Sequence, residues 1–382
     1  MDLSLTEEQL MFRDLFAEFA AKEVAPQAAQ LDAEEGLPLP VLQKAAEQGF
    51  LGAPLPEAYG GAGLDTLGYT LLLEALGRAC LSTAFTIHTH IGLAALTILR
   101  HGTEEQKRRY LPALTTGERI GAFALTEPEA GSDLGILRTR ARREGDFYIL
   151  NGAKAWVANG EIAGLFVVFA RAEGGATAFL LEREADGLAV GRRERMLGLR
   201  GLALSPLYLE GCRIPIENRL GAEGEGLAIA RAAQNRGRLG VAAMSLGAAQ
   251  AALDLGMAFA LQRKQFGVFI AEKQAIQNYL ADSTAEIAAL RQLVTYVAWR
   301  ADRGGDYTQD AAIAKLFGSQ VAMRVANRMV QVHGGAGYMK DYPIERWFRD
   351  CRALDIAEGP GLWQRAVIAR AMLEEKGIAV IA

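Results

Sequence analysis

The sequence predicts an α+β protein of three parts: an N-terminal all-α domain (residues 1–120), a middle β-barrel or β-sheet domain (121–223) and a C-terminal four-helix bundle (224–382). Three observations lead to this prediction. The chain of 382 residues is longer than one typical domain. Helical periodicity fills its first third, and short strand-like runs replace it near Gly121. Alanine-rich helical segments then return after a glycine-rich link at 221–226.

The first domain opens with a strong helix signal. Thr6 and Gln9 have the spacing of a capping box, in which each side chain accepts a hydrogen bond from the other residue's backbone N–H. Phe16 and Phe19 then recur on one face at helical spacing. The sequence therefore predicts a helix over about 5–26. The same periodicity predicts four more helices, at about 38–50, 66–79, 83–100 and 104–116.

Turn signals and short apolar runs mark the middle domain. The stretch RTRARREGDFYILNGAKAW, residues 138–156, contains Gly-Asp and Asn-Gly breaks. Asn-Gly is a preferred two-residue hairpin turn because both of its positions tolerate positive φ, so we expect β-hairpins here. Three further apolar runs, at 165–171, 176–182 and 205–215, extend the strand pattern. Together these strands predict a small sheet or barrel.

The last third has the pattern of a helical bundle. Long helical runs occupy about 226–262, 271–303, 308–333 and 360–376. Each has a wide apolar stripe to bury, and short turns join them, so the simplest arrangement is a four-helix bundle. The sequence lacks a G-x-G-x-x-G that opens a βαβ unit, which disfavours a Rossmann nucleotide site.

Composition narrows the function classes. A net charge of −4 without a long basic run disfavours binding to nucleic acid or to an anionic membrane surface. The three cysteines, Cys80, Cys212 and Cys351, are odd in number and lack CxxC spacing, and the four histidines have no metal-ligand spacing. The N-terminus is acidic where a signal peptide would be basic, and no long uncharged apolar run follows. We expect a cytoplasmic protein without a metal site or a membrane span.

Three stretches carry groups suited to chemistry, although each also has an ordinary structural interpretation. AFALTEPEAGSD (122–133) is a polar loop whose backbone N–H groups and Thr126 and Ser132 hydroxyls can bind phosphate oxygens, but such loops are usually bland. NGAKAWVANG (151–160) places Trp156 in a strand, where an aromatic residue is core by default. QVHGGAGYMKDYPIERWFRD (331–350) follows a helix and is compatible with a glycine C-cap and turn.

Taken together, in this order and on this α/β/α plan, the three stretches resemble the acyl-CoA dehydrogenase family of flavoenzymes over essentially the whole chain. ALTEPEAGSD is similar to the family's first signature and QVHGGAGYMKDYPIERWFRD to its second. The resemblance implies a homotetrameric enzyme that binds FAD between the β domain and the bundle. It also implies an acyl-CoA substrate and electron transfer to an electron-transfer flavoprotein.

The resemblance further implies two sets of FAD contacts and a CoA site. The first set lies at the flavin and pyrophosphate and consists of Phe123, Leu125, Thr126, Ser132, Trp156, Val157 and Ala158. The second set comes from an adjacent subunit, holds the ADP half, and consists of Arg263, Phe266, Gln274, Gln331, Gly334 and Gly335. An arginine matches the pyrophosphate charge, and glycines allow close backbone approach. For CoA, the matching residues are Ser132, Asn235 and Arg238.

Glu358, in the stretch DIAEGPG (355–361), resembles the family's catalytic base, which removes a proton from the α-carbon of an acyl thioester while a β-hydride passes to flavin N5. Gly359 allows the backbone to approach the substrate, where the base residue's own N–H holds the thioester oxygen. A dry pocket would raise the pKa of Glu358 toward the working pH. A solvated glutamate near a helix start is the alternative interpretation. In some members the base aligns with Gly237, where a glycine cannot serve.

Several positions depart from the family pattern. Ala357 and Pro360 replace a usual tyrosine and threonine beside the base, and Ala158 replaces a hydroxyl residue that bonds flavin N5. Leu362, Leu202 and Leu204 replace other polar residues. Two alternatives to the dehydrogenase therefore stay open. One is a flavin oxidase or monooxygenase, or a dehydrogenase of thioesters on an acyl carrier protein; the other is a non-catalytic partner subunit with a degenerate flavin site.

Overall fold

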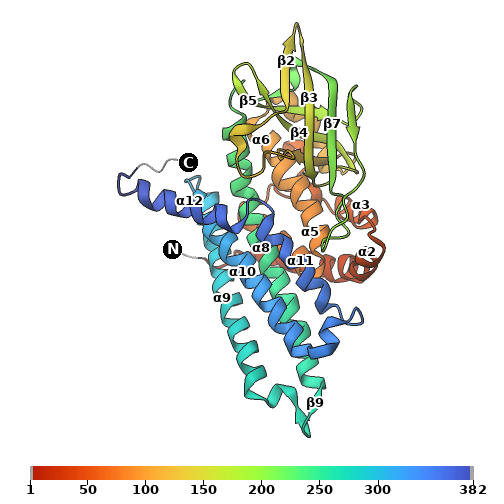
Figure 1. Ribbon diagram of the computed structural model, residues 1–382, viewed down its shortest axis with the longest axis vertical. Helices are drawn as coiled ribbons and strands as arrows, with labels where there is room; N and C mark the ends of the chain where they lie inside the picture. Colours follow the sequence, from red (N-terminus) through yellow and green to blue (C-terminus); the bar gives the residue numbers. More distant parts are fainter. Residues whose placement is uncertain (1–2, 379–382) are drawn as a thin grey trace.

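The computed structural model of the chain describes residues 3–378, and it has the predicted order of a helical domain, a β domain and a second helical domain (Figure 1). The ends of the predicted outer domains, 1–2 and 379–382, lie outside the described residues. The N-terminal helices pack along one side of the C-terminal helices, mainly through α4 (Thr66–Ala79) on α8 (Gly226–Gln262). The β domain lies at one end of this helical body (Figure 1).

The N-terminal domain begins at the predicted capping box. The Thr6 Oγ1 accepts a hydrogen bond from the Gln9 N–H at 3.2 Å, and the Gln9 Oε1 accepts one from the Thr6 N–H at 3.0 Å. Helix α1 (Glu7–Phe19) continues through a π-turn and a 3-10 turn into α2 (Ala28–Glu34). The helical path therefore runs past Pro26, because a proline in the first turn of the 3-10 segment loses no hydrogen bond.

The other predicted N-terminal helices are confirmed. They are α3 (Leu39–Glu47), α4, α5 (Leu81–His88), α6 (Leu96–His101) and α7 (Glu104–Thr115). A π-helical segment, Thr89–Ala95, joins α5 to α6. Within residues 3–378, Leu81–His101 and α8 are long and apolar enough to cross a membrane by length and composition alone, but 94% and 61% of their most apolar windows are buried in the protein. Core helices of this kind pass the same test.

The middle domain is an eight-stranded sheet in the order β6-β7-β3-β2-β4-β5-β8, with β1 paired in parallel to β4. Its strands are β1 (Ile120–Ala124), β2 (Arg140–Glu144), β3 (Phe147–Val157), β4 (Ala163–Ala172), β5 (Gly175–Glu182), β6 (Leu188–Val190), β7 (Ser205–Pro215) and β8 (Arg219–Leu220). Alternate residues of β4 join two different cores: Leu165, Val167 and Phe169 pack in one cluster, and Phe166 and Val168 in the other. The strand is therefore apolar on both faces.

The predicted hairpin turn at Asn-Gly is wrong. The turn lies at Gly145-Asp146, since Glu144 pairs with Phe147 across it. Asn151-Gly152 instead lies inside β3, where the pairing with β7 shifts register. Asn151 Oδ1 accepts a hydrogen bond from the Gly211 N–H at 2.7 Å, and a Cβ at position 152 would come within 2.7 Å of the Thr139 backbone. Close backbone approach at a bulge, and not a chain reversal, explains the glycine.

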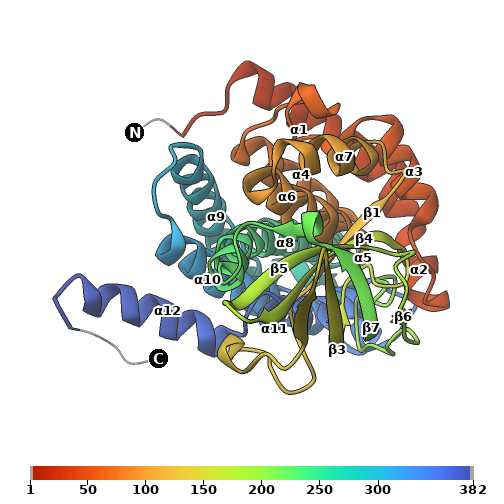
Figure 2. The same cartoon turned by 90° about the horizontal axis from the view of Figure 1, so that it is seen from above.

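The C-terminal domain contains α8, α9 (Gln274–Asp302), α10 (Thr308–His333), α11 (Ile344–Ile356) and α12 (Gly361–Glu374). The prediction took the 360–376 helix as the fourth member of the bundle. In the structure α11 packs on both α8 and α10, because its buried face carries Trp347, Cys351 and Leu354. Helix α12 packs mainly on α10 and extends away from the bundle (Figures 1 and 2). The sequence stretch of α11 had been attributed to a motif and not to a helix.

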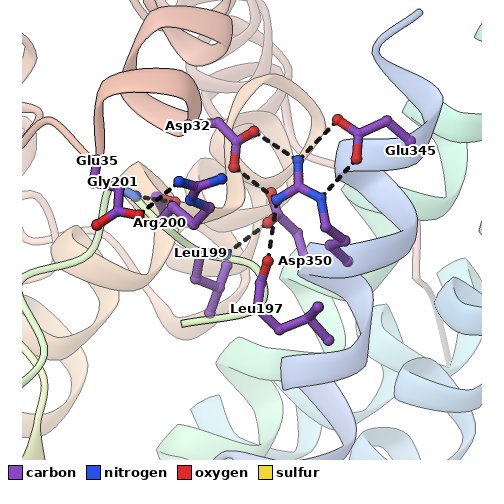
Figure 3. A network of polar contacts seen from close by, with 10 residues as sticks. Asp32, Glu35, Leu197, Leu199, Arg200, Gly201, Glu345 and Asp350 are labelled. Atoms are coloured by element: carbon purple, nitrogen blue, oxygen red, sulfur yellow. Dashed lines mark hydrogen bonds and ion pairs between the residues drawn. The ribbon is translucent and has the colours of Figure 1, made fainter. Parts of the chain in front are cut away.

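A polar network ties the three domains together at α11 (Figure 3). The Arg349 guanidinium binds Asp32 of α2 at 2.6 Å and Glu345 of its own helix at 2.6 Å. Asp350 Oδ1 accepts a hydrogen bond at 2.6 Å from the Leu199 N–H in the loop between β6 and β7. Burial tends to raise the pKa of Asp32, but Arg349 more than offsets it and holds that pKa below its usual range. Residues 349 and 350 are thus interdomain contacts.

Candidate active site

Glu358 lies in the short loop where α11 ends and the chain reverses into α12. Glu358 and Gly359 have φ values of 54° and 87°. Positive φ is ordinary for glycine but uncommon for glutamate, and such a conformation persists only where the surroundings enforce it. The backbone N–H of Glu358 donates to none of the other described residues. The loop therefore presents a strained acidic residue with a free backbone donor.

The Glu358 carboxylate rests against Gly237 in the first part of α8. A Cβ placed on Gly237 would lie 2.3 Å from Glu358 Oε2 and 2.8 Å from its Cδ. A side chain at position 237 would therefore force the carboxylate to move from this position. Within residues 3–378, this carboxylate forms neither a hydrogen bond nor an ion pair. The absence of a side chain at position 237 leaves room for the Glu358 carboxylate.

The surroundings of Glu358 favour its neutral form more than water does. The residue keeps part of its surface accessible, yet enough protein surrounds its carboxyl group that desolvation raises its pKa to about 7. Lys315 and Arg238 act in the opposite direction through their positive charges. The net upward direction is the one expected from sequence. A carboxylate with a pKa near the working pH is suited to act as a general base.

The two CoA candidates on α8 lie next to this site. Arg238 Nη1 donates to Asn235 Oδ1 at 2.6 Å, and Asn235 Nδ2 donates to Thr308 Oγ1 at 2.7 Å. Arg238 is only 4% exposed, and its Nε–H has no partner in the described chain. Burial lowers the pKa of Arg238, while the Glu358 carboxylate raises it. The structure therefore brings Asn235, Arg238 and Glu358 together; contact with CoA stays a prediction.

Trp156 is not a core residue. It has a φ of 53°, lies within a register shift between β3 and β7, and is 57% exposed. The neighbouring Val157 side chain is buried in the β-domain core, as is that of Leu125 in a second cluster, so these two residues can offer a ligand only backbone groups. Phe123 and Ala158 are half-buried. An exposed indole on a strained strand is a suitable surface for a planar ring.

A buried ion pair that the sequence did not reveal shapes the 122–133 loop. Lys154 Nζ lies 2.7 Å from Glu127 Oε1, and both side chains are buried. Glu127 also accepts backbone hydrogen bonds from Arg138 at 2.6 Å and Thr139 at 3.0 Å. Burial lowers the pKa of Lys154 to about 8, against the attraction of Glu127. Neither the burial of Lys154, in a strand that mixes buried and exposed residues, nor its partner could be read from spacing in the sequence.

The same loop leaves free groups for a ligand. The Ala155 N–H donates to Thr126 O at 2.9 Å, which fixes the loop beside Trp156. The Thr126 and Ser132 hydroxyls have no partner within residues 3–378, and Gly131 has open space where a Cβ would stand. Free hydroxyls, open backbone and an exposed aromatic ring fit the pyrophosphate and ring system of a flavin dinucleotide.

The second predicted FAD set lies elsewhere in the same chain. All six residues are exposed, and Phe266, in the hairpin formed by β9 (Lys264–Gln265) and β10 (Val268–Phe269), is 92% exposed. Gly237 is near the start of α8 and Arg263 follows its end, so at 1.5 Å per residue the two are roughly 40 Å apart. Gly334 and Gly335 also face open space. Arg263 therefore lies far from Gly237, against which the Glu358 carboxylate rests.

Lys315 is a further site residue that sequence reasoning missed. It lies on α10 with its side chain fully buried, and its Nζ donates to Asp355 O at 3.0 Å and to Gly359 O at 2.7 Å. The signal was present: in AAIAKLFGS, Lys315 falls on the buried stripe with Ala311 and Gly318. A lysine on an apolar helix face demands buried partners.

Comparison with known proteins gives consistent matches along the chain. Three family models match: "Acyl-CoA dehydrogenase, N-terminal domain" at residues 6–118, the middle domain at 122–212 and the C-terminal domain at 224–373. A relative from Clostridium acetobutylicum, "Acyl-CoA dehydrogenase, short-chain specific", is 42% identical over 97% of this chain and 99% of its own length. The matches span all three domains of the fold.

Two solved structures are similar over almost their full length. Butyryl-CoA dehydrogenase from Megasphaera elsdenii has a TM-score of 0.95 and 38% identity, with 98% of this chain and 100% of that chain covered. A structure described as the electron transferring flavoprotein of Acidaminococcus fermentans has a TM-score of 0.96 and 42% identity, with the same coverage. These likenesses cover the Glu358 loop and both predicted cofactor sets.

Proposed function

The chain belongs to the acyl-CoA dehydrogenase family, and from this premise we propose that Glu358 is the base that removes the α-proton of a bound acyl thioester. The protein is an oxidoreductase that carries out FAD-dependent α,β-dehydrogenation of acyl-CoA. The observation that carries the role of Glu358 is its unpaired carboxylate, held over Gly237 with a pKa raised to about 7.

The chemistry asks two things of the chain. The α-proton of a thioester is weakly acidic, so its removal needs a nearby base and a donor for the oxygen that gains negative charge. The Glu358 carboxylate supplies the first, and its free backbone N–H supplies the second. Gly359 leaves the backbone open to the substrate on that side. When FAD is bound, it accepts the hydride from the β-carbon.

We further propose that the substrate is a short acyl-CoA. Beyond Gly237 on α8, the His88 ring lies over Gly240, where a Cβ would come within 2.2 Å of its Cε1. The His88 Nδ1 is hydrogen-bonded to the Tyr69 hydroxyl at 2.9 Å, and Arg236 is buried on the same stretch of helix. These large side chains fill the interior behind the base, which supports a short chain. The similarity to a short-chain enzyme and to butyryl-CoA dehydrogenase supports the same proposal.

The proposal includes the assembly and its electron acceptor. We propose a homotetramer in which Thr126, Ser132 and Trp156 of one subunit and Arg263 and the other exposed residues of a second subunit hold one FAD. The distance along α8 between Gly237, beside Glu358, and Arg263 supports this. We also propose that an electron-transfer flavoprotein reoxidises the enzyme in the cytoplasm, as part of fatty acid metabolism. The similar structure that includes such a flavoprotein supports the acceptor.

Anaerobic titration of the purified protein with butyryl-CoA tests the function. The yellow protein should bleach, and the Glu358→Gln variant should stay yellow at the same substrate concentration. Longer and branched acyl-CoA thioesters should bleach the wild type more slowly. Rapid oxygen consumption by the reduced protein would instead identify an oxidase, and a protein that purifies without FAD and cannot be reconstituted would identify a non-catalytic subunit.

A further inference from the structure

We propose that Lys315 is a positioning residue for this reaction: its buried ammonium group holds the two carbonyl groups that flank Glu358 and so keeps the carboxylate over Gly237. This inference rests on the proposed role of Glu358 as base. Within residues 3–378, Lys315 forms no hydrogen bond or ion pair with the Glu358 carboxylate; its hydrogen bonds go to backbone carbonyls. It acts through the backbone on both sides of the base.

The hydrogen bonds of Lys315 define this hold. Its Nζ reaches from α10 to Asp355 O, at 3.0 Å, and to Gly359 O, at 2.7 Å. Asp355 O belongs to the last turn of α11, where carbonyl groups lack intrahelical partners and a positive charge is favourable. Gly359 O lies just after the base. The ammonium group therefore links the end of a rigid helix to the loop that follows it.

A second buried donor, from α12, binds the same loop. Gln364 Nε2 of α12 donates to Glu358 O at 3.0 Å and to Gly359 O at 2.9 Å. Both Lys315 and Gln364 are fully buried. Two helices thus fix a loop in which Glu358 and Gly359 both have positive φ. A strained conformation of this kind needs such enforcement, because a free loop would relax to an ordinary backbone shape.

The positive charge of Lys315 acts on the Glu358 carboxylate in a way that a neutral donor could not. Burial lowers the pKa of Lys315 to about 8, while the negative charges of Asp355 and Glu358 raise it. The groups that act on Glu358 are Lys315 from α10 and Arg238 from α8, and Tyr69 of α4 lies within the field of Glu358. A buried cation at this point favours the ionised, reactive form of the base. Gln364 also donates hydrogen bonds to the loop backbone, but it has no charge that would favour the ionised base.

Four variants separate these effects. Lys315→Met removes both the donor and the charge, Lys315→Gln keeps a neutral donor, and Gln364→Leu removes a neutral donor only. Arg324→Met is the matched control, because it also removes one positive charge from α10 but from an ion pair with Glu286. Each holoenzyme is measured by the rate of flavin reduction with butyryl-CoA between pH 5.5 and 9, and by hydrogen–deuterium exchange of the 354–362 peptide.

We expect Lys315→Met to reduce flavin about 10- to 100-fold more slowly at pH 7, because misplaced reacting groups lose rate steeply. Its exchange in 354–362 should be faster, and the pH at which its rate rises should move upward. Gln364→Leu should show faster exchange, but the pH at which its rate rises should not move. In Lys315→Gln that pH should move upward, with smaller changes in exchange. Arg324→Met should match the wild type in both measurements.

The proposal is overturned if Lys315→Met keeps the wild-type rate, pH profile and exchange, or if Arg324→Met shows the same changes. If Lys315→Met does not fold, Lys315→Gln decides by the same criteria. The Glu358→Gln variant separates this outcome from a failure of the proposed function. A wild-type rate of flavin reduction in the Glu358→Gln variant would refute the role of Glu358 as base. The exchange data would still decide whether Lys315 holds the loop.

Discussion

The two regions expected to surround one FAD molecule are built in opposite ways. Around Glu358, beside the first part of α8, buried donors from α10 and α12 hold the loop backbone, while the carboxylate itself has no partner among residues 3–378. At the far end of α8, Arg263 and Phe266 are exposed, and Gly334 and Gly335 face open space. The first region is enclosed by elements of one chain, whereas the second is an exposed surface. This contrast is the one expected if one subunit supplies the base and a second subunit supplies part of the proposed FAD site.

Replacing the base should give the largest effect, and it should alter only the region around Glu358. Glu358→Gln should slow flavin reduction by roughly 10²–10⁴-fold, the range that a general base contributes. FAD content and tetramer assembly should stay at the wild-type level, because the distant surface is untouched. Stopped-flow reduction and the visible spectrum measure the two properties. A variant that loses FAD along with its rate would contradict the separation.

Removing an arginine from the exposed region should have the complementary effect. Arg263→Ala should weaken FAD binding about 10- to 100-fold, since a hydrogen bond to a charged group contributes about 1.5–3 kcal/mol. Flavin reduction at saturating FAD should stay near the wild-type rate. Equilibrium dialysis and reduction at high FAD distinguish the two, and exposed Lys44→Ala, far from both regions, is the control. Unchanged FAD affinity would remove Arg263 from the predicted site.

The pH dependence of flavin reduction tests how far the Glu358 carboxyl group is shielded from water. Burial raises the pKa of Glu358 to about 7, and only the deprotonated carboxylate can accept the α-proton. The rate of reduction should therefore be level above about pH 8 and fall about tenfold for each unit below pH 7. Single-turnover reduction across this range measures it. An inflection near 4.5 would show that the carboxylate is solvated in the working enzyme.

A methyl group at position 237 should give the smallest of these effects. Gly237→Ala would place a Cβ 2.3 Å from Glu358 Oε2, the flexible end of the side chain, which can move aside. We expect a rate loss of about tenfold or less and a loss of stability of about 1–3 kcal/mol, the usual range when a methyl group is added at a packed position. Stopped-flow reduction and thermal unfolding check both values. Gly256→Ala, farther along α8, serves as a comparison for crowding without a nearby base.

Sequence reasoning predicted the elements well where local patterns decide them. The capping box at Thr6 and Gln9 and the apolar stripes of the long helices are local signals, and each corresponds to an observed element. Asn151-Gly152 misled because the same two residues suit a turn and a bulge, and pairing with β7 decided between them. Helix α11 was missed because its amphipathic face, with Trp347 and Cys351, was attributed to a motif.

The site was predictable in its residues but not in its contacts. The resemblance singled out Glu358, and the glycine at 237 was recognised as unable to act as a base. That the two touch follows from how α8 packs beside the end of α11, which no spacing along the chain reports. Lys315 was open to prediction from its place on a buried stripe, but its partners are backbone carbonyls, which carry no residue signature.

Asp350, at the junction of the three domains, makes a contribution to the stability of the folded protein that depends on pH. Burial raises the pKa of Asp350 from 3.8 to about 6, so the folded protein holds this proton more tightly than the unfolded chain. The stabilisation is complete below about pH 4 and is lost as the pH rises through 6, a difference of roughly 3 kcal/mol. Rapid turnover, by contrast, requires mildly alkaline conditions. Buried His88 and His90, whose pKa values burial lowers to about 4, act in the opposite direction, so Asp350 offsets part of the stability that these histidines lose on acidification.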